Sequence, residues 1–303
     1  MHLHTLAIVL FILSFGYQGE VEETPYPVAE TTTVKTPELA PFDDGTINCP
    51  GSIALMYHKI VAEPEDVTDG YGITTDINTF DKIVWYLVEV GYYFPTPEEF
   101  AQDMKTRVCR EKYAIITIDD SWNDPEKMGV NDVLKTYGGG SGIPGSPKVW
   151  LGIVSGGLTA PSAKPDLLAN IRRGQEQGLV YPVSHSRTHP AILIDPFSPF
   201  SPVNDSVYAQ IAGELGPSRR DVLNLFGTEP FFFIYPGGNV TRTIMNGLAP
   251  AGYSGAFTVT PGGLHRAYPY LLPRINAGYG CDNKVSQTIL CVISKINKYS
   301  HQR

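Results

Sequence analysis

The stretch AIITIDD at residues 114–120 decides the fold, because it joins a continuous apolar strand directly to two carboxylates. Other short apolar runs follow, and segments with helical periodicity separate them. Strands this apolar, each followed by a helix, are typical of a parallel sheet that is buried on both faces. We expect strands at 52–57, 114–118, 149–154, 179–184, 231–235, 255–259 and 271–275, and helices at 79–90, 131–137, 164–177, 206–226, 241–248 and 285–296.

This alternation predicts an α/β fold. At least six strand–helix units without a glycine-rich nucleotide fingerprint favour a distorted or incomplete (β/α) TIM-like barrel over a doubly wound sheet. In such barrels the functional side chains lie where the strands end. The residues that follow each apolar run are therefore the first candidates for a site.

Composition narrows the class of protein. The chain has 303 residues, of which 42% are hydrophobic and 18% charged, so it is a folded globular protein rather than a disordered one. Its net charge is −8, and residues 20–45 account for −6 of this, which leaves a nearly neutral body of −2. A nucleic-acid-binding surface is therefore not expected.

The N-terminus is typical of an exported protein. The apolar run LAIVLFILSF (6–15) is shorter than the roughly 20 residues of a membrane-spanning helix, and small residues at Ser14 and Gly16 suit cleavage after position 16. We expect a signal peptide at 1–16, an acidic linker rich in Pro and Thr at 17–48, and a catalytic domain at 49–303. The mature protein would be secreted or extracytoplasmic, without stable membrane insertion; an uncleaved N-terminal anchor is the alternative.

Polar residues follow two of the expected strands. Asp119 and Asp120 end the strand at 114–118, and His185 and His189 follow the strand at 179–184. Alone, the Asp pair could be an ordinary turn, and two histidines four residues apart are only a weak metal signal. Because both lie at the same predicted rim, together they predict a metal site of two imidazoles and one carboxylate.

Two further features belong to the later apolar runs. The turn Tyr235-Pro236-Gly237-Gly238 follows the strand FFFI, and its glycines would let backbone N–H groups approach a developing oxyanion, although an ordinary turn is the alternative. Arg274 lies inside the last apolar run, where a buried cation requires a carboxylate partner; Asp119 and Asp120 are the candidates.

The chain has four cysteines without a CxxC pair, which argues against a thiolate zinc site and favours disulfides in an exported protein. Cys49 and Cys109 each precede an expected strand by about four residues, so adjacent parallel strands would bring them together at the non-catalytic end. Cys281 and Cys291 would then pair with each other. Free thiols or another pairing are the alternatives.

Seven stretches of the chain, read in order, resemble the polysaccharide deacetylases, the NodB-homology domain of the family 4 carbohydrate esterases, in the branch with an LPRI strand. The resemblance covers nearly all of residues 50–276. The matching stretches are IALMYHKI (53–60), TFDKIVWYLVEVGYYFPTPEEF (79–100), AIITIDDSWND (114–124), VSHSRTHP (183–190), FFFIYPGGN (231–239), GYSGAFTV (252–259) and PYLLPRI (269–275).

The resemblance implies a metal-dependent hydrolase that removes N- or O-acetyl groups from an acetylated polysaccharide or oligosaccharide. It implies Asp119 as the general base, a divalent ion (most often Zn²⁺) on Asp120, His185 and His189, and an acetyl pocket along Pro236–Gly238. Arg274 would orient Asp119. The sequence has Ser121 where the family commonly has Gly, and no clear Leu-x-His acid, for which His265 is the nearby candidate.

These departures keep two alternative functions open, a catalytically impaired carbohydrate-binding relative and another metal-dependent amidase on the same scaffold. The sequence does not name the polymer.

Overall fold

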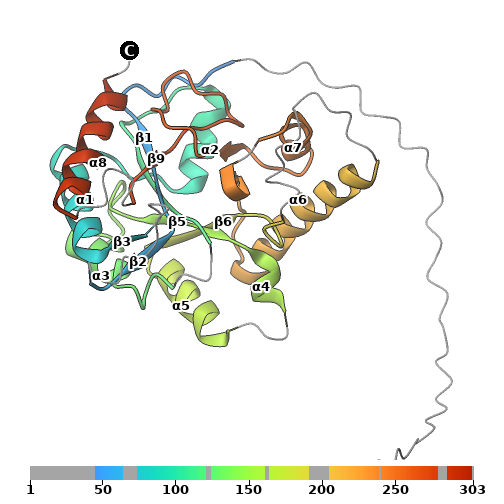
Figure 1. The fold of residues 1–303 in the computed structure, drawn as a ribbon, viewed down its shortest axis with the longest axis horizontal. Helices are drawn as coiled ribbons and strands as arrows, with labels where there is room; N and C mark the ends of the chain where they lie inside the picture. Colours follow the sequence, from blue (N-terminus) through green and yellow to red (C-terminus); the bar gives the residue numbers. More distant parts are fainter. Residues whose placement is uncertain are drawn as a thin grey trace, which may run out of the picture. The chain divides into compact units, whose positions relative to one another are not determined.

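Seven parallel strands form the central sheet, which curls into an incomplete (β/α) barrel (Figure 1). The structure is a computed structural model that describes residues 45–63, 74–120, 124–160, 164–190, 205–238, 240–278 and 285–301. The strand order is β8-β7-β6-β5-β4-β1-β9, and every neighbouring pair is parallel. The strands are β1 (Ile53–Tyr57), β4 (Ala114–Ile118), β5 (Val149–Ile153), β6 (Val180–Ser184), β7 (Phe232–Ile234), β8 (Gly255–Phe257) and β9 (Ile275–Asn276); β2 (Lys59–Val61) and β3 (Thr74–Asp76) form a separate pair.

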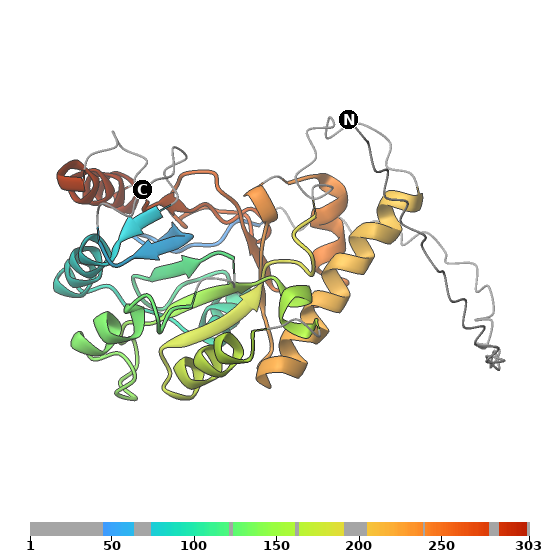
Figure 2. The same cartoon turned by 60° about the horizontal axis from the view of Figure 1, so that its bottom comes forward.

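Helices cover the outer face of this sheet. Helices α1 and α8 pack side by side near β1, and α6 packs against β6, α4 and α7 (Figures 1 and 2). The helices are α1 (Ile77–Glu89), α2 (Pro97–Thr106), α3 (Val130–Thr136), α4 (Ser155–Thr159), α5 (Pro165–Glu176), α6 (Asp205–Phe226), α7 (Arg242–Leu248) and α8 (Val285–Ser300), with a 3₁₀ turn η3 at Pro236–Gly238. Within the described residues, no helix is both long and apolar enough to cross a membrane.

Alternation along the strands divides the core into two layers. Ile53 and Leu55 of β1 face the helices, whereas Ala54 faces the inside of the curl. The inside is filled by aromatic rings, among which Trp150 lies 5.1 Å from Phe232 between ring centroids. A barrel filled in this way has no central pore, so a site must lie at one end of the strands.

Helix α2, which the sequence analysis did not predict, contributes Phe100 to this interior. The ring of Phe100 stacks on Phe232 at 5.2 Å. A capping box at Thr96 and Glu99 starts the helix, with each side chain bonded to the other residue's backbone N–H. The capping box was thus a readable signal for the helix.

The expected strand at 271–275 is wrong in its bounds. Leu272 makes an isolated parallel bridge to Phe257 of β8, and pairing resumes only at β9, where Ile275 lies beside Leu55 of β1. Pro273 between them has no N–H to donate to a ladder. Residues 272–276 therefore contact both edges of the sheet and form a seam, which places Arg274 between them.

The domain begins before the predicted boundary at residue 49. Ile47 is buried in the inner core, and its backbone N–H donates to Ala267 at 2.9 Å. Residues 45–48 of the predicted linker thus pack on the domain. The predicted signal peptide and the remainder of the linker lie outside the described residues.

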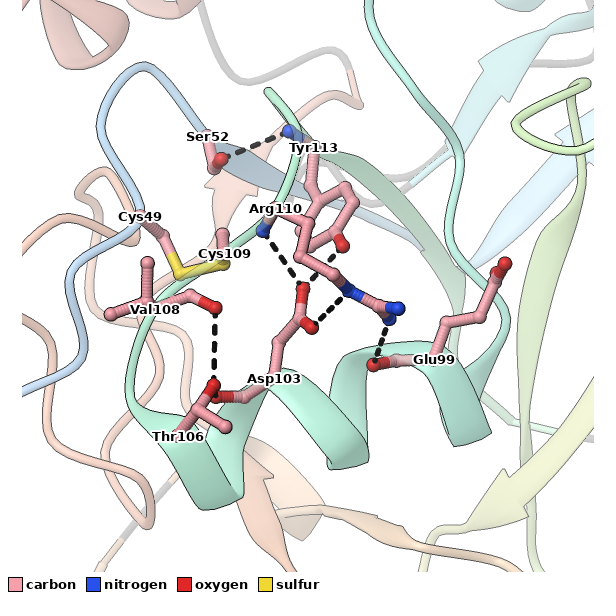
Figure 3. The surroundings of a disulfide bond; sticks show 9 residues. All are labelled: Cys49, Ser52, Glu99, Asp103, Thr106, Val108, Cys109, Arg110 and Tyr113. Atoms are coloured by element: carbon pink, nitrogen blue, oxygen red, sulfur yellow. Dashed lines mark hydrogen bonds and ion pairs between the residues drawn. A yellow bond between two sulfur atoms is a disulfide. The ribbon is translucent and has the colours of Figure 1, made fainter.

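The predicted bridge between Cys49 and Cys109 is confirmed (Figure 3). Their Cα atoms are 4.8 Å apart, and Asn48 and Val108 form a parallel bridge beside them. The second expected bridge, between Cys281 and Cys291, involves Cys281, which lies outside the described residues.

Beside this bridge Asp103 is buried and accepts hydrogen bonds from Arg110 and from the hydroxyl of Tyr113 (Figure 3). The bridge and the Asp103 cluster together fix the segment that leads into β4.

Replacing both Cys49 and Cys109 with Ser should lower the free energy of unfolding by about 2–4 kcal/mol, because the bridge closes a loop of 60 residues. Urea denaturation of oxidised wild type and of the double variant measures the difference. An equal stability of the two would contradict a native bridge, and non-reducing peptide mapping provides an independent check.

Candidate metal centre and active site

The candidate site lies at the carboxyl ends of β1, β4 and β6. Ile118 pairs with Tyr57, so Asp119 and His58 follow directly from adjacent strand ends. The backbone N–H of His185 donates to Ile153 of β5 at 2.9 Å, which carries the ladder one residue beyond β6. The prediction that these strand ends share one rim is confirmed.

A glycine on the intervening strand allows the groups to approach. A Cβ atom at Gly152 of β5 would lie 3.3 Å from the Cβ of His185 and 3.4 Å from the Cα of Asp119. The first distance is tighter than most real Cβ contacts and the second is at the limit of ordinary van der Waals contact, so a side chain at position 152 would require its neighbours to shift by a few tenths of an ångström.

Asp120, His185 and His189 can hold a metal ion. One ligand atom from each lies within 4.8 Å of the others, and Asp120 Oδ1 is 3.4 Å from His185 Nε2 and 3.6 Å from His189 Nε2. Asp120 Oδ1 is buried and has no hydrogen-bond partner among the described residues. A buried carboxylate oxygen that faces two imidazole nitrogens is what a divalent cation would satisfy.

The orientation of His185 supports this assignment. Its Nδ1 lies 2.9 Å from the carbonyl oxygen of Ile234. A carbonyl can only accept, so Nδ1 carries the proton and the lone pair of Nε2 faces Asp120. The protein thereby fixes the tautomer that a metal ligand requires.

The backbone is strained at these same residues. Asp120, Ser186 and His189 have φ angles of 63°, 65° and 54°, in the left-handed region. This region costs a non-glycine residue about 1–2 kcal/mol, and such strain tends to collect at functional sites. Ser186 Oγ accepts from the N–H of His189 at 3.0 Å and so stabilises the turn between the two imidazoles.

Asp119 lies beside this cluster and is held by the seam residue Arg274. Arg274 Nη1 donates to Asp119 Oδ1 at 2.6 Å and to Thr117 Oγ1 at 2.8 Å, and its Nε donates to the carbonyl of Thr258. Both side chains are buried, with Arg274 at 0% and Asp119 at 2% exposure. The sequence analysis left Asp119 and Asp120 as candidate partners of Arg274, and in the structure the partner is Asp119.

This pair sets the ionisation of Asp119. Burial acts to raise the pKa of the carboxyl, but the guanidinium of Arg274, together with His185 and His58, brings the pKa below its ordinary value. Asp119 is therefore an anion at neutral pH, as a group that accepts a proton must be.

His58 follows the first strand and was not selected as a site residue from the sequence, because a lone histidine is more often structural. Its Nε2 lies 3.7 Å from Asp119 Oδ2. Burial lowers the pKa of this imidazole, while the carboxylate of Asp119 acts to raise it. Its position after the first strand was the available signal, because the ends of adjacent parallel strands meet at one rim.

His265 is not brought to this rim, which corrects its prediction as a site residue. The N–H of Leu264 donates to Ser52, and the N–H of Arg266 donates to Ile47. Ser52 precedes β1, so His265 lies near the amino end of the barrel, opposite Asp119. The loop that carries it has no periodicity from which its path could have been predicted.

The turn at 235–238 does reach the site, because Ile234, which bonds to His185, comes immediately before it. Tyr235 itself is buried, and its hydroxyl donates to Tyr270 at 3.0 Å, so its side chain belongs to the core rather than to a substrate surface. The N–H groups of Tyr235 and Gly238 donate to backbone carbonyls, and Pro236 has none. Within the described part of the chain, the N–H of Gly237 is the donor this turn leaves for an oxyanion.

Neither a family model nor a curated protein matches this sequence. Solved structures do match, and they show that the chain has the fold of the polysaccharide deacetylases.

Deacetylase PplD from Streptococcus pyogenes, solved with acetate, aligns with a TM-score of 0.60 at 22% identity over 78% of this chain and 97% of its own. IcaB from Ammonifex degensii aligns with a TM-score of 0.60 at 17% identity, over 85% of this chain and 100% of its own. The polysaccharide deacetylase BC0361 from Bacillus cereus aligns with 0.55 at 19% identity, over 78% and 68%.

Replacing His185 or His189 with Ala should abolish stoichiometric binding of zinc, because either change leaves two ligands of three. Metal analysis of the purified proteins after dialysis measures this. The exposed His301→Ala provides the matched control and should bind as wild type does. Full metal content in both ligand variants would place the metal elsewhere.

Replacing Arg274 with Met should lower the free energy of unfolding by about 3–5 kcal/mol, because it leaves a buried carboxylate without its partner. Asp119→Asn alone should also destabilise the protein, and the double variant should lose less than the sum of the two changes. Denaturant unfolding of all four proteins completes the cycle. Additive losses would mean that the two side chains do not interact in solution.

Proposed function

We propose that the protein is a metal-dependent hydrolase that removes acetyl groups from an acetylated polysaccharide or oligosaccharide. The observation that carries the proposal is that two carboxylates lie at one rim in different surroundings. Asp120 faces two imidazoles, whereas Asp119 is directed to a buried arginine. The first arrangement suits a metal ligand and the second a base outside the ligand set. The deacetylase fold supports the choice of substrate.

Two imidazoles and one carboxylate favour zinc or a similar borderline divalent ion over magnesium or calcium. Such an ion, when bound, polarises the acyl carbonyl and makes water a stronger acid. Asp120, His185 and His189 would supply three ligands to such an ion, the number typical of a catalytic rather than a structural site.

The chain's own residues supply the remaining chemistry. Asp119 accepts the proton of the attacking water, and Arg274 keeps the carboxylate ionised and oriented. We assign stabilisation of the oxyanion of the tetrahedral intermediate to the N–H of Gly237.

We assign proton donation to the departing amine or alkoxide to His58, in place of His265. His58 lies next to Asp119, and the lowered pKa of its imidazole leaves this side chain neutral before the reaction. The proton that Asp119 takes from the attacking water passes to His58, and His58 then donates it to the departing group.

We further propose that the protein works outside the cytoplasm. The apolar run at 6–15 followed by a small residue at 16 supports export. The Cys49–Cys109 bridge supports it independently, because disulfides persist in oxidising compartments.

The direct test is acetate release from a panel of acetylated substrates: chitin oligomers, peptidoglycan, acetylxylan and a β-1,6-linked N-acetylglucosamine oligomer. Each is assayed with added zinc and with a chelator. We expect release from at least one polymer, loss of release with the chelator, and recovery on zinc addition. Binding without release would favour an impaired carbohydrate-binding protein, and release only from acylated peptides would favour another amidase.

Replacing Asp119 with Asn should reduce turnover by about 100- to 10,000-fold while zinc remains bound, because a positioned base contributes that much to the rate. Turnover is expressed per bound zinc and measured where thermal unfolding shows the variant to be folded. Asp132→Asn, which removes an exposed carboxylate, is the control. Turnover near the wild-type rate would give the base role to another group.

A paired comparison of histidines tests the acid. His58→Ala should reduce turnover by about 100-fold or more, whereas His265→Ala should leave it nearly unchanged. Zinc content should be as in wild type for both. The opposite ranking would restore His265 as the acid and would require the loop at 259–271 to move.

A further inference from the structure

The loop between His185 and His189 is held from outside by one buried carboxylate. Glu214 on α6 accepts hydrogen bonds from the backbone N–H of Arg187 at 2.8 Å and of Thr188 at 2.9 Å, both on Oε2. Its Oε1 accepts from the hydroxyl of Thr188 at 2.7 Å. Three donors from two consecutive residues thus converge on a side chain that is 9% exposed.

No cation among the described residues pairs with Glu214. Arg187, whose backbone N–H binds Glu214, directs its side-chain Nε to Asp221 instead, at 3.4 Å from Oδ2. The charge of Glu214 is therefore stabilised by the two N–H dipoles and one hydroxyl, an arrangement that depends on the exact path of the backbone.

Glu214 is itself rigidly placed. One turn further along α6, Ser218 Oγ lies 2.5 Å from the hydroxyl of Ser184, the residue that precedes His185. On the other side, the hydroxyl of Tyr253 donates to the carbonyl of Leu215 at 3.1 Å. These hydrogen bonds fix helix α6 to the end of β6 and to the neighbouring core. The side chain of Glu214 therefore extends to the loop from a helix whose position is fixed.

The loop needs such support because its backbone is strained. Ser186 and His189, on either side of the bonded pair, both have left-handed φ angles. His185 is fixed by β6 and by Ile234, but His189 lies beyond the strand and depends on the path of residues 186–188. Without Glu214 the two N–H groups would lose their acceptor, and the loop could relax its strain by moving His189 away from Asp120.

We propose that Glu214 is a positioning residue for the metal centre: its carboxylate sets the backbone of Arg187 and Thr188 and thereby the place of the second imidazole. The proposal rests on the metal centre of the proposed function. This positioning role requires the length of the Glu214 side chain and an acceptor oxygen at its end, but not the negative charge.

Two substitutions separate reach from charge. Glu214→Gln keeps an oxygen at the position of Oε2 for both N–H groups, and the Thr188 hydroxyl can rotate to accept from the amide. Glu214→Asp keeps the charge but is one methylene short. We expect Gln to bind zinc within about threefold of wild type, and Asp and Ala to lose about 10- to 100-fold in affinity, as is typical when a residue supporting a ligand is removed.

Zinc affinity is measured by competition with a chelator of known affinity, and thermal unfolding of the zinc-free proteins shows that each variant is folded. Asp221→Asn is the matched control, because it removes a carboxylate from the same helix that contacts the side chains of Arg187 and Ser155 but not the loop backbone. It should bind zinc as wild type does. If Glu214→Ala does not fold, the Gln and Asp variants decide the question alone.

Affinity of Glu214→Asp within about threefold of wild type would overturn the proposal, as would a Gln variant as weak as the Asp variant. His189→Ala serves as the reference for a lost ligand. If that variant binds zinc normally, the proposed metal centre is wrong. If His189→Ala loses zinc but Glu214→Asp binds it normally, the metal centre stands and only the role of Glu214 is wrong.

Discussion

The ion pair between Arg274 and Asp119 is the constraint on which the site depends. A guanidinium and a carboxylate are both removed from water here, and neither could remain charged in this interior alone. Arg274 reaches Asp119 because the seam at residues 272–276 contacts both β8 and β1. The near-closure of the barrel and the ionisation of Asp119 are therefore consequences of the same few residues.

The two carboxylates of the site, Asp119 and Asp120, have the same chemistry but different surroundings. Asp119 continues the ladder of β4, since its N–H donates to Tyr57 at 2.8 Å, and it faces a fixed cation. Asp120, one residue later, turns through a left-handed conformation toward the imidazoles. A single change of backbone direction thus gives adjacent, chemically identical residues two different roles.

The sequence predicted those parts of the structure that arise from periodicity and strand ends. The strand at 114–118 has the predicted bounds, and the predicted ligands Asp120, His185 and His189 meet because parallel strands end at one rim. The path of long loops could not be predicted, because no periodic pattern fixes it. For this reason His265 was predicted at the site, whereas it lies near the amino end of the barrel. Glu214 could not be predicted either, since a glutamate on a helix is ordinary and only the fold brings it to the loop.

The Cys49–Cys109 bridge also has a directional consequence. It ties the first described residues to the amino end of the sheet, and Ile47 bonds to Ala267 at that same end. The candidate site lies at the other end of the same strands. The first described residues and the candidate metal ligands Asp120, His185 and His189 therefore lie at opposite ends of the barrel.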